Sequence, residues 1–345
     1  MTGGYRQFCL VILPCNLQTV ALRKYAAAKR NGIDCFILAD IGLGYNHMVR
    51  IMEFTDRVRW VARLRLPSLS GYGSPEDALE AKSNCRSDCS VKAPFMLMDC
   101  LKGNVGMDLG MEIPPEFKKS FLNDLAKAHV QLSTVQLPQI ATIVSFNAAD
   151  GTCQQGPIPE LGGPFNTATE FFQAWAAKAR FGMTEEKLRQ ASGPYAAEIV
   201  PSVSSFPESI GRLADRLSVL HRGPFPVCHG DFGHNIIVGD AYQILGIIDW
   251  ETAFAGPWEM FGDFPLSLST VPRAMDVPWN YNEDGIPKDS DLVRKFADRE
   301  DYVTAVAREE EDQIGEEDHR LLYEIGKAGW YDKVIDEFLL TQAVL

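Results

Sequence analysis

Two carboxylates and one carboxamide, those of Asp231, Asp249 and Asn235, flank two short β-like runs at residues 236–238 and 243–248. A Gly-Asp pair between the runs predicts a tight turn, and folding this hairpin brings the three side chains to one end of it. Oxygen ligands of this kind suit Mg²⁺, which usually binds one or two carboxylates together with the phosphates of a substrate. The other carboxylate is then available to accept a proton, so this set predicts phosphoryl transfer to a hydroxyl.

The front of the chain reads as a helix followed by an antiparallel β meander. Residues 17–30 contain helix-forming residues and end at an Asn-Gly pair, which predicts a helix. Residues 35–39, 48–54 and 59–66 predict three strands, and the apolar residues 94–101 predict a buried fourth strand that leads into a linker.

The rest of the chain is mainly helical in its pattern. Apolar residues at helical spacing predict an amphipathic helix over residues 115–132, and two more helices are predicted at 167–180 and 207–221. Residues 150–166 are rich in Gly and Pro and predict a loop. Polar, acidic helices are expected toward the end of the chain.

These patterns predict three parts. A helical extension covers residues 1–32, a small β-rich domain covers residues 33–101, and a larger, mostly helical domain covers residues 102–345. The hairpin with its carboxylates belongs to the third part.

Charge and cysteine content exclude several classes of function. The chain of 345 residues has 33 basic and 46 acidic residues and a formal net charge of −13. A protein this acidic lacks the broad positive field that nucleic acids and anionic membranes require, so neither is an expected partner. The eight cysteines are scattered, and Cys85-x3-Cys89 has no second Cys or His pair nearby, so we expect loop cysteines and a cytoplasmic location.

Several motifs resemble those of one enzyme family. His229-Gly230-Asp231, then Asn235, then Ile-Ile-Asp-Trp-Glu at 247–251 resemble the catalytic and metal-binding motifs of the aminoglycoside phosphotransferase family, a branch of the protein-kinase-like superfamily. The Ala-Gly-Pro-Trp-Glu at 255–259 is similar to the usual continuation. The resemblance implies a fungal-type member with a two-lobed α+β fold, in which a small β-rich N-lobe precedes a larger, mostly helical C-lobe.

The same resemblance implies roles for the hairpin residues. Asp231 would be the catalytic base, and Asp249 would hold Mg²⁺ at the position of the Asp in the kinase Asp-Phe-Gly motif. Asn235 would help to hold the second metal ion. The activity implied is ATP-dependent transfer of the γ-phosphoryl group to a hydroxyl of a small molecule.

In the front lobe, the resemblance implies a nucleotide site. Gly42, Gly44 and Asn46 lie in a turn that would cover the phosphates, and Arg63 stands where kinases place their nucleotide-binding lysine. Arginine is always charged and binds phosphate bidentately, so this exchange is compatible with nucleotide binding. Glu80 is the candidate partner of Arg63.

Residues 94–101 resemble the hinge strand of a kinase. Met98 and Cys100 are the residues of this strand that would contact ATP. Residues 125–129, Leu-Ala-Lys-Ala-His, resemble the helix that supports the catalytic loop.

Three differences from the family pattern leave a second interpretation open. Three residues separate Asp231 from Asn235 where the family has four, only about thirty residues separate Arg63 from the hinge strand, and Arg63 replaces a lysine. The N-lobe is therefore expected to be shortened. The alternative is a catalytically inactive kinase-like protein that binds nucleotide or serves as a scaffold.

A third interpretation takes His229, Asp231, His234 and Asn235 as ligands in a metallohydrolase. Such sites also need an upstream His-x-His or Asp-x-His pair, and the sequence contains neither. The phosphoryl acceptor and the oligomeric state leave no sign in the sequence.

Overall fold

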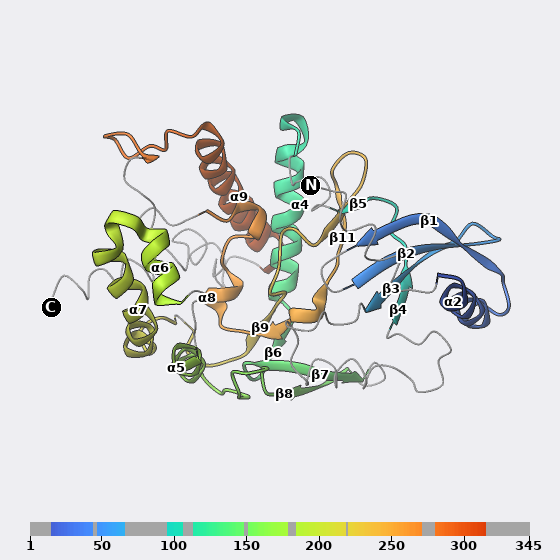
Figure 1. Ribbon diagram of the computed structural model, residues 1–345, viewed down its shortest axis with the longest axis horizontal. Helices are drawn as coiled ribbons and strands as arrows, with labels where there is room; N and C mark the ends of the chain where they lie inside the picture. The colour runs from blue at the N-terminus through green and yellow to red at the C-terminus, as the bar shows by residue number, and fades with distance from the viewer. Residues whose placement is uncertain are drawn as a thin grey trace. The chain divides into compact units, whose positions relative to one another are not determined.

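The computed structural model describes residues 15–43, 47–65, 95–105, 113–147, 151–178, 184–218, 220–270 and 280–314 (Figure 1). The chain divides into two compact units, Met1–Lys102 and Gly103–Leu345. The first is rich in β-structure and the second is mainly helical, which confirms the predicted α+β class. The separate role of residues 1–32 stays a prediction.

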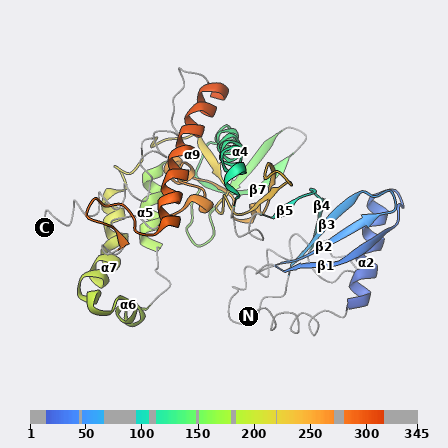
Figure 2. The same ribbon diagram turned by 90° about the horizontal axis from the view of Figure 1, so that it is seen from above.

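The first unit contains a four-stranded antiparallel sheet with one face covered by a helix (Figures 1 and 2). The sheet order is β1-β2-β3-β4, with the strands β1 (Cys35–Leu43), β2 (His47–Phe54), β3 (Arg59–Arg65) and β4 (Phe95–Asp99). Alternate residues of a strand point to opposite faces, and Met48, Met52, Ala62 and Leu64 are buried on one of them. Helix α2 (Cys15–Lys29) packs on this face and contributes Leu22 and Ala26 to the core.

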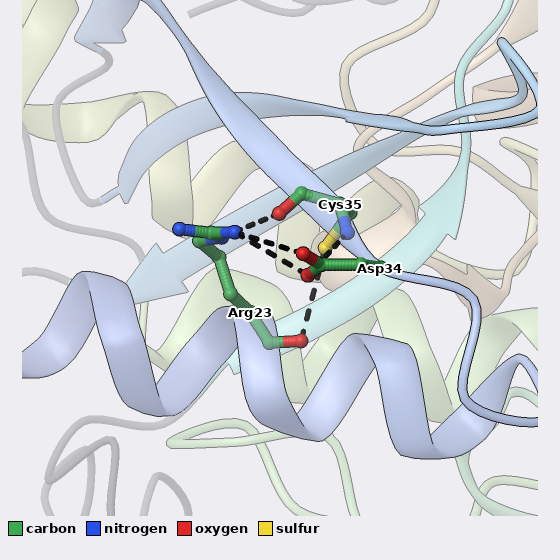
Figure 3. A network of polar contacts seen from close by, with 3 residues as sticks. All are labelled: Arg23, Asp34 and Cys35. Carbon is green, nitrogen blue, oxygen red and sulfur yellow. Dashed lines mark hydrogen bonds and ion pairs between the residues drawn. The ribbon is translucent and has the colours of Figure 1, made fainter.

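A polar cluster joins α2 to the start of β1, as Figure 3 shows. Arg23 of α2 donates from Nε to the carbonyl oxygen of Cys35 and from Nη2 to the Asp34 carboxylate, 3.3 Å away. The Cys35 thiol donates to the carbonyl oxygen of Arg23 at 3.7 Å. Burial raises the pKa of this thiol. The cluster therefore anchors the helix, while burial favours the neutral form of the Cys35 thiol.

Strand β1 is longer than predicted. The sequence pattern predicts its end at residue 39, but the pairing with β2 continues to Leu43 after a register shift between Ile37 and Ile41. A bulge of this kind lets a strand continue where its alternation is interrupted. As a result Gly42, predicted in the turn, lies in the strand opposite Val49.

The second unit combines helices with two small sheets. Its helices are α4 (Pro115–Ser133), α5 (Ala168–Lys178), α6 (Glu185–Ser192), α7 (Ala196–Leu213), α8 (Trp258–Phe261) and α9 (Ser290–Ile314), with short 3₁₀ helices at Gly193–Tyr195, Trp250–Thr252 and Leu266–Leu268. One sheet has the order β11-β10-β5 and the other β6-β9-β12-β7-β8.

The strands of these sheets are short. They are β5 (Asn104–Val105), β6 (Gln136–Leu137), β7 (Ala141–Asn147), β8 (Thr152–Gly156), β9 (Phe225–Cys228), β10 (Ile236–Val238), β11 (Ile244–Ile247) and β12 (Phe254–Ala255). β10 and β11 form the predicted hairpin, and β9 precedes it. A core beneath them contains Leu125 of α4, Ile236 of β10 and Tyr302 of α9.

Two predictions in this unit are wrong. A helix was expected to start near Pro207, but α7 begins at Ala196 and contains both Pro201 and Pro207. Proline favours helix starts, yet this helix continues past both prolines, and its last turns pack against α5 through Ile210 and Leu213. The loop expected over residues 150–166 contains β8, a polar edge strand whose pairing with β7 does not depend on an apolar pattern.

Within the part of the chain that the structure describes, no helix is long and apolar enough to cross a membrane.

Candidate active site

The predicted catalytic loop connects the buried strand β9 to β10. It begins at His229 and ends at Asn235, and both side chains are buried. Gly230 and Gly233 have φ values of +82° and +114°, which residues with a Cβ rarely adopt. A Cβ on Gly233 would lie 2.8 Å from the backbone nitrogen of Leu266. The backbone path of this loop therefore requires glycine at both positions.

His229 connects the loop to the end of the hairpin. Its Nε2 lies 2.8 Å from the carbonyl oxygen of Ile248, and its Nδ1 lies 3.3 Å from the backbone N–H of Asp231. A carbonyl can only accept, so Nε2 carries the proton and Nδ1 accepts from Asp231. The imidazole thus holds the backbone of the loop in place.

Asn235 connects the loop to the candidate base. Its Nδ2 donates to the Asp231 carboxylate at 2.6 Å and to the Asp231 carbonyl oxygen at 3.2 Å. The backbone carbonyl oxygen of Asn235 accepts a hydrogen bond from the backbone N–H of Ile248 at 2.8 Å. The loop therefore brings Asp231 and Asn235 into direct contact although only three residues separate them.

Asp249 directly follows Ile248, the residue to which His229 and Asn235, the two ends of the loop, are both hydrogen bonded. Its backbone is left-handed, with φ 68° and ψ 54°. This conformation is uncommon outside glycine, although aspartate tolerates it better than most residues, and it often occurs at functional sites. The backbone at Asp249 turns sharply between β11 and the 3₁₀ helix at Trp250–Thr252.

The residues at the hairpin end fit a magnesium ion that also binds phosphate. Asn235 uses Nδ2 toward Asp231, which leaves Oδ1, the atom that ligates cations, outside that pair. Across the described ranges, no group of three or more His, Cys, Asp or Glu residues forms a complete metal site. Mg²⁺ usually takes only one or two protein ligands beside substrate phosphates, so two donors suffice.

In the first unit, the sheet aligns three of the predicted nucleotide-binding residues. Gly42 pairs with Val49, Val49 pairs with Arg63, and Arg63 pairs with Met96, two residues before Met98. Because strand residues alternate between faces, Gly42, Arg63 and Met98 lie on the face opposite the α2 core. Cys100 follows β4 and donates its backbone N–H to the carbonyl oxygen of Arg59 at 3.1 Å.

Three predicted nucleotide-binding residues, Gly44, Asn46 and Glu80, lie outside the described residues, as do Cys85 and Cys89. The sequence patterns also missed His47, whose Nδ1 lies 3.0 Å from Nη2 of Arg63. This contact depends on the β2–β3 register, which places His47 diagonally from Arg63.

Replacing Gly230 by Ala is expected to destabilise the second unit more than the same change at Gly151. Both residues have positive φ, so each alanine costs about 1–2 kcal/mol of backbone energy. At Gly230 the new Cβ also meets the carbonyl oxygen of Thr252 at 2.9 Å, whereas Gly151 has open space. That overpacking adds about 1–3 kcal/mol. Urea unfolding of both variants measures the difference, and equal losses would show that the loop yields to the extra atom.

In this chain a β-rich unit is followed by a mainly helical unit, in which a His-Gly-Asp loop enters a hairpin that ends in Asp. The chain belongs to the phosphotransferase enzyme family, whose sequence pattern matches residues 22–260. No curated protein sequence matches the chain.

Solved structures of three kinds resemble the chain at low identity. A macrolide 2'-phosphotransferase type I is 15% identical over 94% of this chain and 92% of its own, with a TM-score of 0.41. A thermostable mutant of aminoglycoside phosphotransferase APH(4)-Ia with ADP and hygromycin B is 15% identical over 94% and 96%, with a TM-score of 0.42. A putative fructosamine-3-kinase from Thermobifida fusca is 14% identical over 91% and 99%, with a TM-score of 0.39.

Proposed function

We propose that the protein transfers the γ-phosphoryl group of ATP to a hydroxyl group of a small molecule. The observation that supports this most directly is the contact between Asp231 and Asn235, at 2.6 Å, next to the strained Asp249. A candidate base and a carboxamide meet there, and Asp249 follows on a backbone segment that hydrogen bonds to the same loop. Membership of the phosphotransferase enzyme family supports the same reaction class.

Each residue has a distinct role in this proposal. The Asp231 carboxylate accepts the proton of the attacking hydroxyl, and the bond from Asn235 fixes its orientation. Asp249 and Oδ1 of Asn235 would hold magnesium, which supplies positive charge beside the phosphates when bound. Most of the rate acceleration then comes from positioning and charge stabilisation.

The nucleotide phosphates are assigned to the face of the first sheet that holds Gly42 and Arg63. The guanidinium of Arg63 can bind two phosphate oxygens at once. Its contact with His47 limits its freedom before the nucleotide binds. Met98 and Cys100, on and after β4, are assigned to the base of the nucleotide.

The acceptor is proposed to be a small molecule in the cytoplasm rather than a nucleic acid or a membrane lipid. The net charge of −13 supports this, because polyanions would be repelled.

Magnesium-dependent binding of ATP is expected to raise the thermal stability of the protein. A ligand at 100 times its Kd adds about 2.7 kcal/mol to the free energy of unfolding. Asp249→Asn is expected to lose the magnesium-dependent part of this gain because it loses a charged ligand. Arg63→Gln is expected to reduce the gain with and without magnesium. Melting curves with ATP, with and without Mg²⁺, measure both effects.

The matched control is Asp240→Asn, which removes an exposed carboxylate from the turn of the same hairpin. It should behave as the unmodified protein does. If ATP does not stabilise the unmodified protein at millimolar concentration, the nucleotide site is absent and the proposed reaction is excluded.

A further inference from the structure

A buried histidine that has no role in the proposed reaction contacts both the catalytic loop and helix α8. His129 lies on α4 and is only 4% exposed. Its ring packs against Phe232, which directly follows Asp231, with 5.1 Å between ring centroids, and against Phe261 of α8, at 4.6 Å. The histidine therefore contacts the loop on one side and α8 on the other.

The hydrogen bonds of His129 define one tautomer. Nε2 lies 2.7 Å from the carbonyl oxygen of Phe261, which can only accept, so Nε2 carries the proton. Nδ1 is then an acceptor, and the Tyr302 hydroxyl donates to it at 2.6 Å. Both polar atoms of the ring are satisfied in the neutral form, and burial lowers the pKa of His129 to about 4. A single neutral orientation results.

The segment that follows α8 also contacts the catalytic loop directly. The backbone N–H of Leu266 donates to the carbonyl oxygen of Phe232 at 2.7 Å. Phe232 is thus restrained twice. Its ring packs against His129, and its backbone is bound by the segment after α8. His129 also binds the end of α8, at Phe261. Because Asp231 is the neighbour of Phe232 in the chain, movement at Phe232 moves the candidate base.

Helix α9 supplies the tyrosine and packs beside α4 in both views of the molecule (Figures 1 and 2). Tyr302 is 3% exposed. Two polar contacts hold the helices together at the surface: Lys118 with Asp298 at 2.9 Å, and Arg308 with Asn123 at 2.7 Å. The donor to His129 is therefore held in place independently of the loop.

We infer that His129, oriented by Tyr302, is a positioning residue that holds Phe232 and so fixes the Asp231 carboxylate for phosphoryl transfer. This inference rests on the proposed function for its catalytic consequence. The restraint on the loop itself can be measured without any activity.

The test is amide hydrogen exchange of the unmodified protein and of Tyr302→Phe, which removes one hydroxyl from a preserved ring. Loss of this donor is expected to speed exchange in residues 229–235 and 261–268 by about tenfold. This is the change in the local opening equilibrium that corresponds to the loss of one buried hydrogen bond. Exchange in β7 and β8, in the same unit, should stay unchanged. If the variant transfers phosphate, kcat should fall by a similar factor while the KM for ATP stays the same.

Ser133→Ala is the matched control. It removes another buried side-chain hydrogen bond from α4, in which Ser133 donates to the carbonyl oxygen of Val130 at 2.7 Å, and it leaves Tyr302 and His129 in place. The control should leave exchange in the loop unchanged.

If Tyr302→Phe does not fold, His129→Gln replaces it in the test. A glutamine still offers a donor and an acceptor but lacks the ring that contacts Phe232, so the loop should again exchange faster. Faster exchange confined to the two segments supports the inference even in a protein without transferase activity. Unchanged exchange in the loop, or an equal increase throughout the second unit, would overturn it.

Discussion

Replacing Asp231 by Asn is expected to lower the turnover of ATP-dependent phosphorylation about 10²–10⁴-fold, the usual contribution of a general base. The substitution keeps the shape of the side chain and an oxygen that can still accept from Asn235 Nδ2, now 2.6 Å from the carboxylate. The loop should therefore keep its structure. ATP affinity, measured by calorimetry in the presence of Mg²⁺, should change little because Asp231 is assigned to the acceptor side of the reaction.

Three outcomes of this experiment lead to different conclusions. Loss of turnover with intact ATP binding supports Asp231 as the base, and Asp240→Asn should keep full turnover as the control. A loss much smaller than a hundredfold would remove Asp231 from that role. ATP binding without turnover in the unmodified protein, across a broad set of hydroxyl acceptors, would favour the inactive, kinase-like alternative.

Acidification is expected to destabilise the protein through His129 by about 3 kcal/mol between pH 7 and pH 4. Burial lowers the pKa of His129 to about 4 from an ordinary value of 6.5. Between these values the unfolded chain binds a proton that the folded chain does not, so stability falls as the pH falls. The gap between the two pKa values, at about 1.4 kcal/mol for each pH unit, sets the size of the loss.

The contribution of His129 is isolated by comparing urea unfolding of the unmodified protein and His129→Gln at pH 7 and pH 4.5. The variant should be less stable at pH 7 and should lose less stability on acidification. His221→Gln, at an exposed histidine, is the matched control and should follow the unmodified protein. Parallel pH profiles for the unmodified protein and His129→Gln would show that His129 is not held neutral in the fold.

Local patterns in the sequence were sufficient to predict the helices and strands that contain the candidate site. Strand alternation and the Gly-Asp turn predicted the β10–β11 hairpin. The order of Asp231, Asn235 and Asp249 around it predicted that the three lie at one end, and the contact of Asp231 with Asn235 agrees with this. The helix α4 and the front meander were predicted within a few residues, apart from β1. These features depend on residues close together in the chain, so neighbouring side chains are enough to encode them.

Helix α7 and strand β8 show where such patterns fail. The prolines in α7 indicated a helix start, and the Gly and Pro content of residues 150–166, which include β8, indicated a loop. In both, contacts with other elements outweigh local preference, since α7 packs on α5 and β8 pairs along β7. Local propensity is a weak guide when distant segments supply the stabilisation.

By itself, the sequence predicted the phosphotransferase family and three candidate residues around the hairpin, and it determined the acidic character that disfavours polyanionic partners. The tertiary structure alone decided how those residues are held: the left-handed backbone at Asp249, the bonds of His229 to Ile248, and the contact of His129 with Tyr302, 173 residues further along the chain. The reason is physical. A turn or a strand is stabilised by neighbours in the chain, whereas a buried hydrogen bond between remote residues forms only after packing has brought them together and excluded water.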